Sequence, residues 1–313
     1  MLNRQLIRTK VVQNLYCYTQ QTDWTELTAQ KELVKSCAQT YDLYHVLLQL
    51  INEITQAAEI RTENLKEKFF ASEEEKNPVL NFVQNKFAEK VFYCKELASY
   101  LQDNKDIHFF WSKHSETIDD LYQQIRESEQ YAKYMSIKAP SFDDDKTIWR
   151  QIFSKILNDN EFLNNCIEDS NLYWVSDLDI VISFVIKTIK QCKSDTELRL
   201  LPLYDNEIDH NFASKLLSQS IKHFDEYKEM IEKSLIHWDI ERVAQIDLTI
   251  MQTALAEMFA FPDIPIQVTI NEYIELAKEY STDQSPKFVN GILDEIVKQL
   301  KKDNRLLKAV IIK

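Results

Sequence analysis

The sequence predicts an all-helical protein. Its 313 residues include one glycine and six prolines, which leaves few turn formers for a sheet protein of this size. Apolar residues make up 44% of the chain, enough to fill a substantial core, and many recur at the i, i+3, i+4 spacing of a helix face. The length suits one large domain or two ordinary ones.

The N-terminal segment, residues 3–20, has the pattern of an amphipathic helix. Its apolar residues follow near-helical spacing: Leu6, Ile7, Val11, Leu15 and Tyr18. The first acidic residue is Asp23, so the charged side chains before it are all cations: Arg4, Arg8 and Lys10. These three lie near one flank of the predicted helix, where they can neutralise phosphates.

Residues 22–204 form a long, acidic middle region that is also predicted to be helical. Helical patterns run over residues 25–70, 79–102, 116–135 and 146–157. Breaks are expected at 73–78, at 138–141 with the following Asp143, Asp144 and Asp145, and at 201–203. A mostly apolar helix from Ile180 to Ile189 is expected to be buried on most sides, and it is a candidate for packing this region on the rest.

From Asp205 the helical pattern resumes. One predicted face carries Phe212, Leu216, Leu217 and Ile221, and Ile231, Leu235 and Trp238 follow. Pro262 and Pro265 then break the chain. Thr269 and Glu272 have the T-x-x-E spacing of a capping box, with Val268 and Tyr273 at the staple positions. This motif predicts a helix capped by Thr269.

The last predicted helix contains the single glycine, Gly291. Ser285 and Pro286 fit an N-cap followed by proline at the first helical position. Asn290-Gly291 is also a hairpin signal, but the apolar neighbours have helical spacing: Val289, Ile292, Leu293, Ile296 and Leu300. Glycine inside a helix costs about 1 kcal/mol relative to alanine, so we expect Gly291 to serve a close contact.

The sequence offers no pattern for catalysis, a cofactor or a metal. One glycine excludes the glycine-rich phosphate loop and the Rossmann turn. Asp42 and His45 are three residues apart on a predicted helix, but a surface hydrogen bond explains such a pair better than a metal site does. Asp143, Asp144 and Asp145 fit a solvated loop with a helix N-cap better than a cation site. We therefore predict a protein that is not an enzyme.

Cysteines and hydropathy give an expectation for the compartment. The five cysteines include no C-x-x-C pair, which is typical of reduced, structural thiols. No run approaches the ~20 apolar residues of a transmembrane helix, and the N-terminus lacks the apolar core of a signal peptide. We expect a soluble, cytoplasmic protein.

The charge distribution favours nucleic acid at the chain ends. A net charge of −13 argues against a polyanion as a partner of the whole surface. Both ends are nevertheless basic, because residues 301–313 also carry five cations against Asp303. Such asymmetry indicates an RNA or DNA face, and a solvated helix end is the alternative explanation.

Several segments carry a resemblance to a known family. At the C-terminal end they are Pro265-Ile266-Gln267-Val268-Thr269-Ile270-Asn271-Glu272, Glu275-Leu276-Ala277-Lys278 and residues 285–294, which include Lys287-Phe288-Val289-Asn290-Gly291. Upstream they are Trp238, Arg242-Val243-Ala244-Gln245-Ile246-Asp247 and Ala254-Leu255-Ala256-Glu257. At the N-terminus they are Arg4, Arg8, Val12-Gln13 and Leu15-Tyr16. Together these segments resemble the NusB family of transcription antitermination factors.

The resemblance implies a fold and a domain order. It implies a NusB-like helical bundle built from residues 1–21 and 205–300, with the first helix packed on the C-terminal helices. Residues 22–204 would be a helical insertion that short members lack, and 301–313 a basic tail. An RNA cytosine methyltransferase with a NusB-like domain is disfavoured, because it needs a long glycine-bearing cofactor domain after that part.

The resemblance also implies a function and a set of site residues. Family members bind boxA, a short single-stranded RNA element of ribosomal RNA leaders, together with the small ribosomal protein NusE, and promote processive transcription by RNA polymerase. The positions that match the RNA site are Arg4, Arg8, Lys10, Gln13, Lys287, Phe288 and Asn290. Those that match the NusE contact are Tyr16, Glu241 and Asp247.

Two points stay open at this stage. Spacing alone favours a core position for Phe288, whereas the resemblance favours a ring on which a base stacks. The segment Arg4-Gln5-Leu6-Ile7-Arg8 also has fewer arginines than short family members often have. A rival hypothesis makes the protein a helical scaffold whose acidic insertion binds other proteins.

Overall fold

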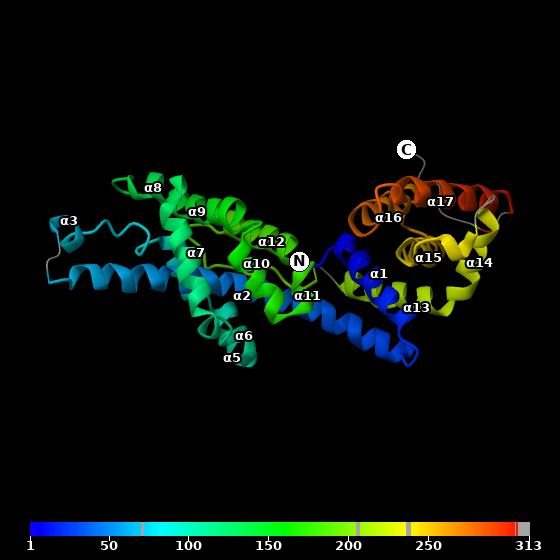
Figure 1. Cartoon of the computed structure of the whole chain (residues 1–313), viewed down its shortest axis with the longest axis horizontal. Helices are drawn as coiled ribbons and strands as arrows, with labels where there is room; N and C mark the ends of the chain where they lie inside the picture. The colour runs from blue at the N-terminus through cyan, green and yellow to red at the C-terminus, as the bar shows by residue number, and fades with distance from the viewer. Residues whose placement is uncertain (70–71, 205–206, 236–238, 304, 306–313) are drawn as a thin grey trace. The chain divides into compact units, whose positions relative to one another are not determined.

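The computed structural model describes residues 1–69, 72–204, 207–235, 239–303 and 305, and these residues are helical with short connections (Figure 1). Within these ranges no residue belongs to a β-strand, and one isolated bridge joins Leu2 and Tyr204. The predicted all-α class is confirmed. Trp238 and most of the basic tail, including Lys308 and Lys313, lie outside the described residues.

The chain divides into two compact units. Unit 1 comprises residues 1–37 and 203–313, and unit 2 comprises residues 38–202. The first boundary therefore lies 16 residues beyond the expected end of the N-terminal segment at residue 21. Hydrogen bonds explain the difference, because Gln30 and Glu26 at the start of the second helix bind Ser214 and Ser218 of unit 1.

Unit 1 is a bundle of helices around α15 (Gln245–Ala260), which is buried along nearly its whole length. Helices α1, α13, α14 and α16 pack against α15, and α16 and α17 lie side by side (Figure 1). Their bounds are α1 Arg4–Gln20, α13 Glu207–Lys222, α14 Phe224–Ser234, η3 Ile240–Arg242, α16 Ile266–Tyr280 and α17 Ser285–Lys302. The first helix thus packs with the C-terminal helices, as the resemblance implied.

Two hydrogen bonds, one within the helix and one to a distant chain segment, fix the start of α1. The Asn3 side chain accepts a hydrogen bond from the Leu6 backbone N–H at 2.9 Å and so caps the helix. The Leu2 backbone N–H donates to the Leu203 carbonyl at 2.7 Å, which brings the two chain segments of unit 1 together. Leu6, Ile7, Val11 and Leu15 are buried, in agreement with the predicted apolar face.

The predicted capping box at Thr269 is wrong. Helix α16 begins three residues earlier, at Ile266, after Pro265. The Thr269 hydroxyl instead donates to Glu257, and the Glu272 carboxylate binds Arg8, so tertiary partners replace the local motif. The start of α17 also differs slightly, because Gln284 is the N-cap and Ser285 the first helical residue.

Unit 2 contains the rest of α2 (Glu26–Lys66) and a series of shorter helices. These are α3 Glu73–Lys76, α4 Lys86–Phe92, α5 Lys95–Asp103, α6 Lys105–His108, η1 Trp111–Lys113, α7 Ser115–Glu127, α8 Glu129–Met135, α9 Phe142–Gln151, η2 Ile152–Leu157, α10 Glu161–Ser170, α11 Leu172–Val175 and α12 Leu178–Gln191. Helix α12 is largely buried, as expected, and packs on α9 and η2. Two predicted helices are each divided, at Tyr93 and at Ser128.

The three consecutive aspartates do not form the predicted solvated loop. Asp143, Asp144 and Asp145 occupy the first turn of α9, where negative charge is favourable near the helix N-terminus. Ser141 and Asp144 form a capping box. Asp145 is 2% exposed and accepts hydrogen bonds from the Tyr134 hydroxyl and the Lys86 backbone N–H.

The Asp42 and His45 side chains are held by other partners. Tyr100 and Gln39 donate to Asp42, whereas His45 is buried, contacts the Tyr41 carbonyl and stacks on Tyr100. Across the described residues no group of three or more potential metal ligands was found. None of the described helices is long and apolar enough to cross a membrane. All five cysteines are free thiols, and four of them are buried.

Candidate nucleic-acid interface

A buried ionic network holds α1 in unit 1. Arg8 is 4% exposed, and its guanidinium donates to both carboxylate oxygens of Glu257 at 2.7 and 3.0 Å. It also donates to Glu272 at 3.1 Å. Thr269 and Tyr273 complete the shell of Glu257 with their hydroxyl groups, at 2.8 and 3.2 Å.

The electrostatics of this network favour the charged form of Arg8. Burial works against the Arg8 guanidinium, but the hydrogen bonds and charge of Glu257 outweigh it and raise the pKa of Arg8. Burial and the same carboxylate raise the pKa of Tyr273, which remains a neutral donor. Arg8 therefore serves as a tie between α1, α15 and α16.

The expectation that Arg8 and Lys10 are available to phosphates is wrong in this structure. Both side chains are buried, Arg8 in the ion pair and Lys10 at 2% exposure. The physical reason is visible in the helical register, since Val11, Val12 and Leu15 follow Arg8 at i+3, i+4 and i+7 and share its buried face. That register was the signal for a core position.

The other predicted RNA residues of α1 are more accessible. Arg4 is exposed, and its guanidinium lies 5.3 Å from the centre of the Phe212 ring on α13. Gln13 is half-buried and donates to the Tyr280 hydroxyl at 3.2 Å, which places it beside the last residue of α16. The Phe212 ring lies below both Arg4 and Arg8, and no sequence pattern predicted this contact.

The remaining RNA residues gather on the first turns of α17. Lys287 is exposed, and Phe288 and Asn290 are half-buried, so the Phe288 ring is neither fully in the core nor fully at the surface. Gly291 is exposed, and a Cβ built there would meet no atom within 4 Å. The predicted close contact at Gly291 is therefore wrong within this chain. The glycine instead leaves open space beside Lys287, Phe288 and Asn290.

The three predicted partner residues are placed differently. Glu241 is exposed on η3, and Tyr16 is half-buried on α1. Asp247 is 5% exposed and accepts a hydrogen bond from the Ser285 hydroxyl at 2.7 Å, so it joins the start of α15 to the start of α17. A direct contact through Asp247 disagrees with this burial.

Comparisons with known proteins match most of the C-terminal part of unit 1. The NusB family profile matches residues 181–298. A transcription antitermination protein NusB from Salinibacter ruber is 36% identical over 132 residues, which cover 40% of this chain and 82% of that protein. The chain belongs to the NusB family. The corresponding proteins of Nitratiruptor sp. and Bacillus subtilis are 46% and 41% identical over 90 and 92 residues, covering 29% of this chain and 64% and 70% of their own lengths.

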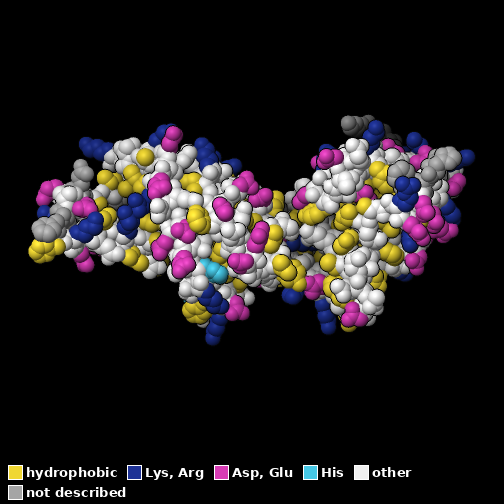
Figure 2. Space-filling view, in the orientation of Figure 1, with side chains coloured by type: hydrophobic (Ala, Val, Ile, Leu, Met, Phe, Trp, Pro, Cys, Tyr) yellow, Lys and Arg dark blue, Asp and Glu magenta, His cyan; other side chains and the backbone are white. Residues whose placement is uncertain are grey.

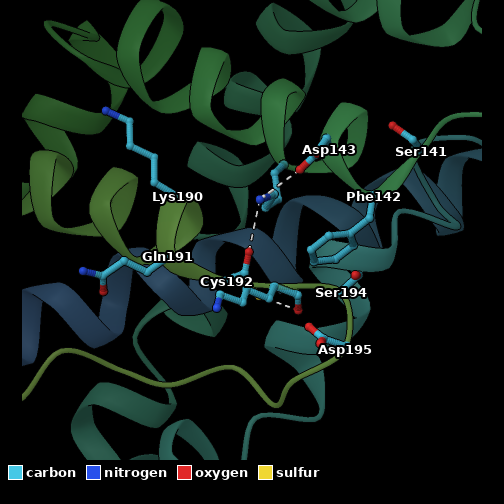
Figure 3. A pocket seen from close by; sticks show the side chains of 10 residues that line it. Ser141, Phe142, Asp143, Lys190, Gln191, Cys192, Ser194 and Asp195 are labelled. Carbon is cyan, nitrogen blue, oxygen red and sulfur yellow. Dashed lines mark hydrogen bonds and ion pairs between the residues drawn. The ribbon is translucent and has the colours of Figure 1, made fainter.

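The NusB family match leaves residues 38–180 of unit 2 outside it. Two hollows lined by described residues of unit 2 differ in size, and the smaller of them, of about 710 Å³, lies between α9 and the end of α12 (Figure 3). One of its lysines, Lys146, already has partners, because it binds Asp143 at 3.0 Å and the Cys192 carbonyl at 3.1 Å. Figure 3 shows Lys190 extending away from Phe142, so these cations do not converge on a ligand.

Proposed function

We propose that this protein is a transcription antitermination factor that binds boxA-type single-stranded RNA of ribosomal RNA leaders together with the small ribosomal protein NusE. It acts by binding and promotes processive transcription by RNA polymerase. Family membership and the names of the relatives support antitermination. The observation that supports RNA binding is the group of accessible residues on the first turns of α17, called the α17 strip: Lys287, Phe288, Asn290 and Gly291.

The chemistry of this strip suits single-stranded RNA. The exposed Lys287 supplies a cation for a phosphate. Phe288 offers a ring for base stacking, which contributes about 1 to 3 kcal/mol per base in single-strand binders. Asn290 can donate to and accept from a base edge. Because Gly291 lacks a side chain and has open space above it, a nucleotide backbone can approach the helix closely there.

The burial of Arg8 and Lys10 changes the expected role of α1. Arg8 supports the site indirectly, because it holds α1 against α15 and α16. Arg4 remains as an exposed cation of α1 for long-range attraction of phosphates. For NusE we propose Glu241 as the acidic contact and Tyr16 as an apolar contact, since basic ribosomal proteins favour carboxylate partners.

The test is fluorescence anisotropy of a labelled boxA-like RNA, with and without NusE, over a salt series. We expect binding that tightens with NusE and weakens with salt. Phe288→Ala should weaken binding about 5- to 150-fold, in line with the loss of one stacked base. Lys287→Glu and Arg4→Glu should weaken it and reduce the salt dependence.

Gln299→Ala is the matched control, because Gln299 is exposed on the same helix two turns after Gly291. It should leave RNA affinity unchanged. Glu241→Lys should weaken the gain from NusE without altering binding of RNA alone. Equal affinity of all variants for RNA, at normal helicity, would remove α17 from the site and contradict the proposal.

A further inference from the structure

The larger hollow of unit 2 is a cleft of about 1180 Å³, slightly above the usual size range of ligand pockets. Its lining comes from α2, from α4 and α5, and from connections near residues 81–84 and 138–140, all inside unit 2. The two main walls differ in chemistry. One is rich in hydrogen-bond acceptors, and the other is mostly apolar.

The acceptor wall is one face of α2. Its side chains recur three or four residues apart, which places them in a row along the helix: Gln49, Asn52, Glu53, Gln56 and Glu59. Gln49 is 7% exposed, and its amide nitrogen donates to Glu53 at 3.2 Å and to the His108 carbonyl at 2.9 Å. The Gln49 amide is therefore held in one orientation.

Two acceptors of this wall have no donor. The side-chain oxygens of Gln49 and Asn52 are buried without a hydrogen-bond partner among the described residues. A buried acceptor without a donor costs free energy, and such groups are rare in native proteins. The α2 wall thus has more acceptors than donors, and its exposed acceptors, Gln56 and Glu59, are the ones that N–H groups of a ligand can reach.

The charge around the cleft selects a cationic ligand. Four carboxylates line it, against two lysines: Glu53, Glu59, Glu89 and Asp145 against Lys86 and Lys138. Lys86 is already paired with Glu89 at 3.0 Å. Residues 38–202 as a whole contain 28 acidic and 19 basic residues, and Figure 2 shows Asp and Glu side chains spread over the visible face of this unit. A polyanion such as RNA is disfavoured here.

The opposite wall and rim are apolar. Ala88, Leu97, Ala98 and Leu101 of α4 and α5 line the cleft. At its edge Phe92 and Tyr93 are 66% and 72% exposed, and their rings meet edge to face at 5.1 Å. Exposed aromatic residues beside a groove are typical anchors of protein interfaces.

We propose that this cleft is the docking site for a basic, amphipathic peptide segment of a partner protein. Lysine or arginine side chains of that segment donate to the α2 wall, and its apolar side chains pack on the α4 and α5 wall beside Phe92 and Tyr93. This activity lies outside the part of the chain that carries the proposed RNA site. The insertion thereby gives the family bundle a second, independent binding function.

The test measures anisotropy of three labelled twelve-residue peptides with the full-length protein: a lysine–leucine amphipathic peptide, its glutamate–leucine counterpart, and a serine–glycine peptide. Hydrogen exchange then maps the bound peptide. We expect selective binding of the basic peptide, with protection of residues 49–59 and 86–101. Failure of the basic peptide to bind, equal binding of the acidic peptide, or protection elsewhere would overturn the proposal.

Surface variants distinguish specific binding in the cleft from general electrostatic attraction of the peptide to an acidic surface. Gln56→Lys with Glu59→Lys should weaken binding of the basic peptide at least tenfold, and so should Phe92→Ser with Tyr93→Ser, because all four residues are exposed and line the cleft. The matched controls are Glu63→Lys, one turn further along α2, and Leu172→Ser, at an exposed leucine outside the cleft lining. The controls should leave affinity unchanged. Equal losses in the controls would contradict a specific cleft, and unchanged boxA binding in all four keeps this test separate from the RNA proposal.

Discussion

The two units of this protein stabilise buried carboxylates in different ways. In unit 1, Glu257 is fully buried and is neutralised by Arg8, which lies 249 residues earlier in the chain. In unit 2, Asp145 is 2% exposed and is held by neutral donors, the Tyr134 hydroxyl at 2.5 Å and the Lys86 backbone N–H at 2.8 Å. Only the first arrangement leaves an unpaired charge when one side chain is removed.

This difference has consequences for stability and for pH dependence. Removing one member of a buried ion pair leaves its partner charged in a poor solvent, which is strongly destabilising. A carboxylate held by hydroxyl groups can instead take up a proton. Burial raises the pKa of Asp145, and the hydrogen bonds from Tyr134 and Lys86 offset this only in part. We therefore expect unit 1 to be sensitive to mutation of its pair and unit 2 to be sensitive to pH.

The largest effect is expected from Glu257→Ala in unit 1. The variant leaves the Arg8 guanidinium buried without its main partner, and we expect a loss of about 3 to 5 kcal/mol. Native-state hydrogen exchange of amides in α1, α15 and α16 measures it locally. Tryptophan fluorescence is a poor reporter here, because it mixes signals from both units: Trp24 and Trp238 belong to unit 1, and Trp111, Trp149 and Trp174 belong to unit 2.

Glu272→Ala is the control for this prediction. Glu272 also binds Arg8, but its side chain is 31% exposed, so we expect a loss below about 1 kcal/mol. Similar effects of the two substitutions would show that solvent exposure does not set the strength of these contacts. That result would contradict the proposed sensitivity of unit 1 to loss of its buried ion pair.

The next effect concerns acidification of unit 2. Burial lowers the pKa of His45 from 6.5 to about 4, so the folded state keeps this ring neutral while the unfolded state gains a proton. The free energy of unfolding therefore keeps its full value above pH 6.5. It decreases as the pH falls toward 4, by up to about 3 kcal/mol. Urea unfolding followed by Trp111, which donates to the Val46 carbonyl, measures it.

His45→Phe should flatten this part of the pH profile, because an aromatic ring can still stack on Tyr100. His223→Gln is the control, since His223 lies in unit 1 and pairs with Glu226 at the surface. An unchanged slope between pH 6.5 and 4 in His45→Phe would assign the loss to other groups.

A smaller effect is expected from Tyr134→Phe. The substitution removes the hydroxyl donor of Asp145, and we expect a loss of about 1 to 3 kcal/mol at pH 7. Without that donor the pKa of Asp145 rises further, so the variant gains more from acidification. Its deficit should shrink as the pH falls through the raised pKa. Urea unfolding followed by Trp149 on the same helix tests this, and a deficit independent of pH would contradict it.

The fold could be predicted from the sequence because its long helices carry strong periodic patterns. The segment 25–70 corresponds to α2. The helical spacing of the apolar residues around Gly291 correctly favoured a helix over a hairpin. The breaks at Tyr93 and Ser128 were missed, because neither has a glycine or proline and both depend on how the short helices pack.

The candidate site was harder to predict because charge and contacts at long range decide it. The positive charge of Arg8 suits a phosphate ligand, but its position along the helix places it on the buried face. Its partner Glu257 is remote in sequence. At Thr269 and Glu272, the same network outcompeted a plausible local cap. The cleft of unit 2 combines residues of α2, α4 and α5, so no short sequence pattern could reveal it.

The smallest effect is a gain in stability from Gly291→Ala. Gly291 lies inside α17 with a helical backbone, and a methyl group there meets no atom within 4 Å. Alanine therefore removes the helix cost of glycine without strain, and we expect a gain of up to about 1 kcal/mol in hydrogen exchange of α17. If RNA approaches this open position, the same variant binds boxA more weakly although it is more stable. A variant that gains stability and keeps full RNA affinity would separate the glycine from the RNA site.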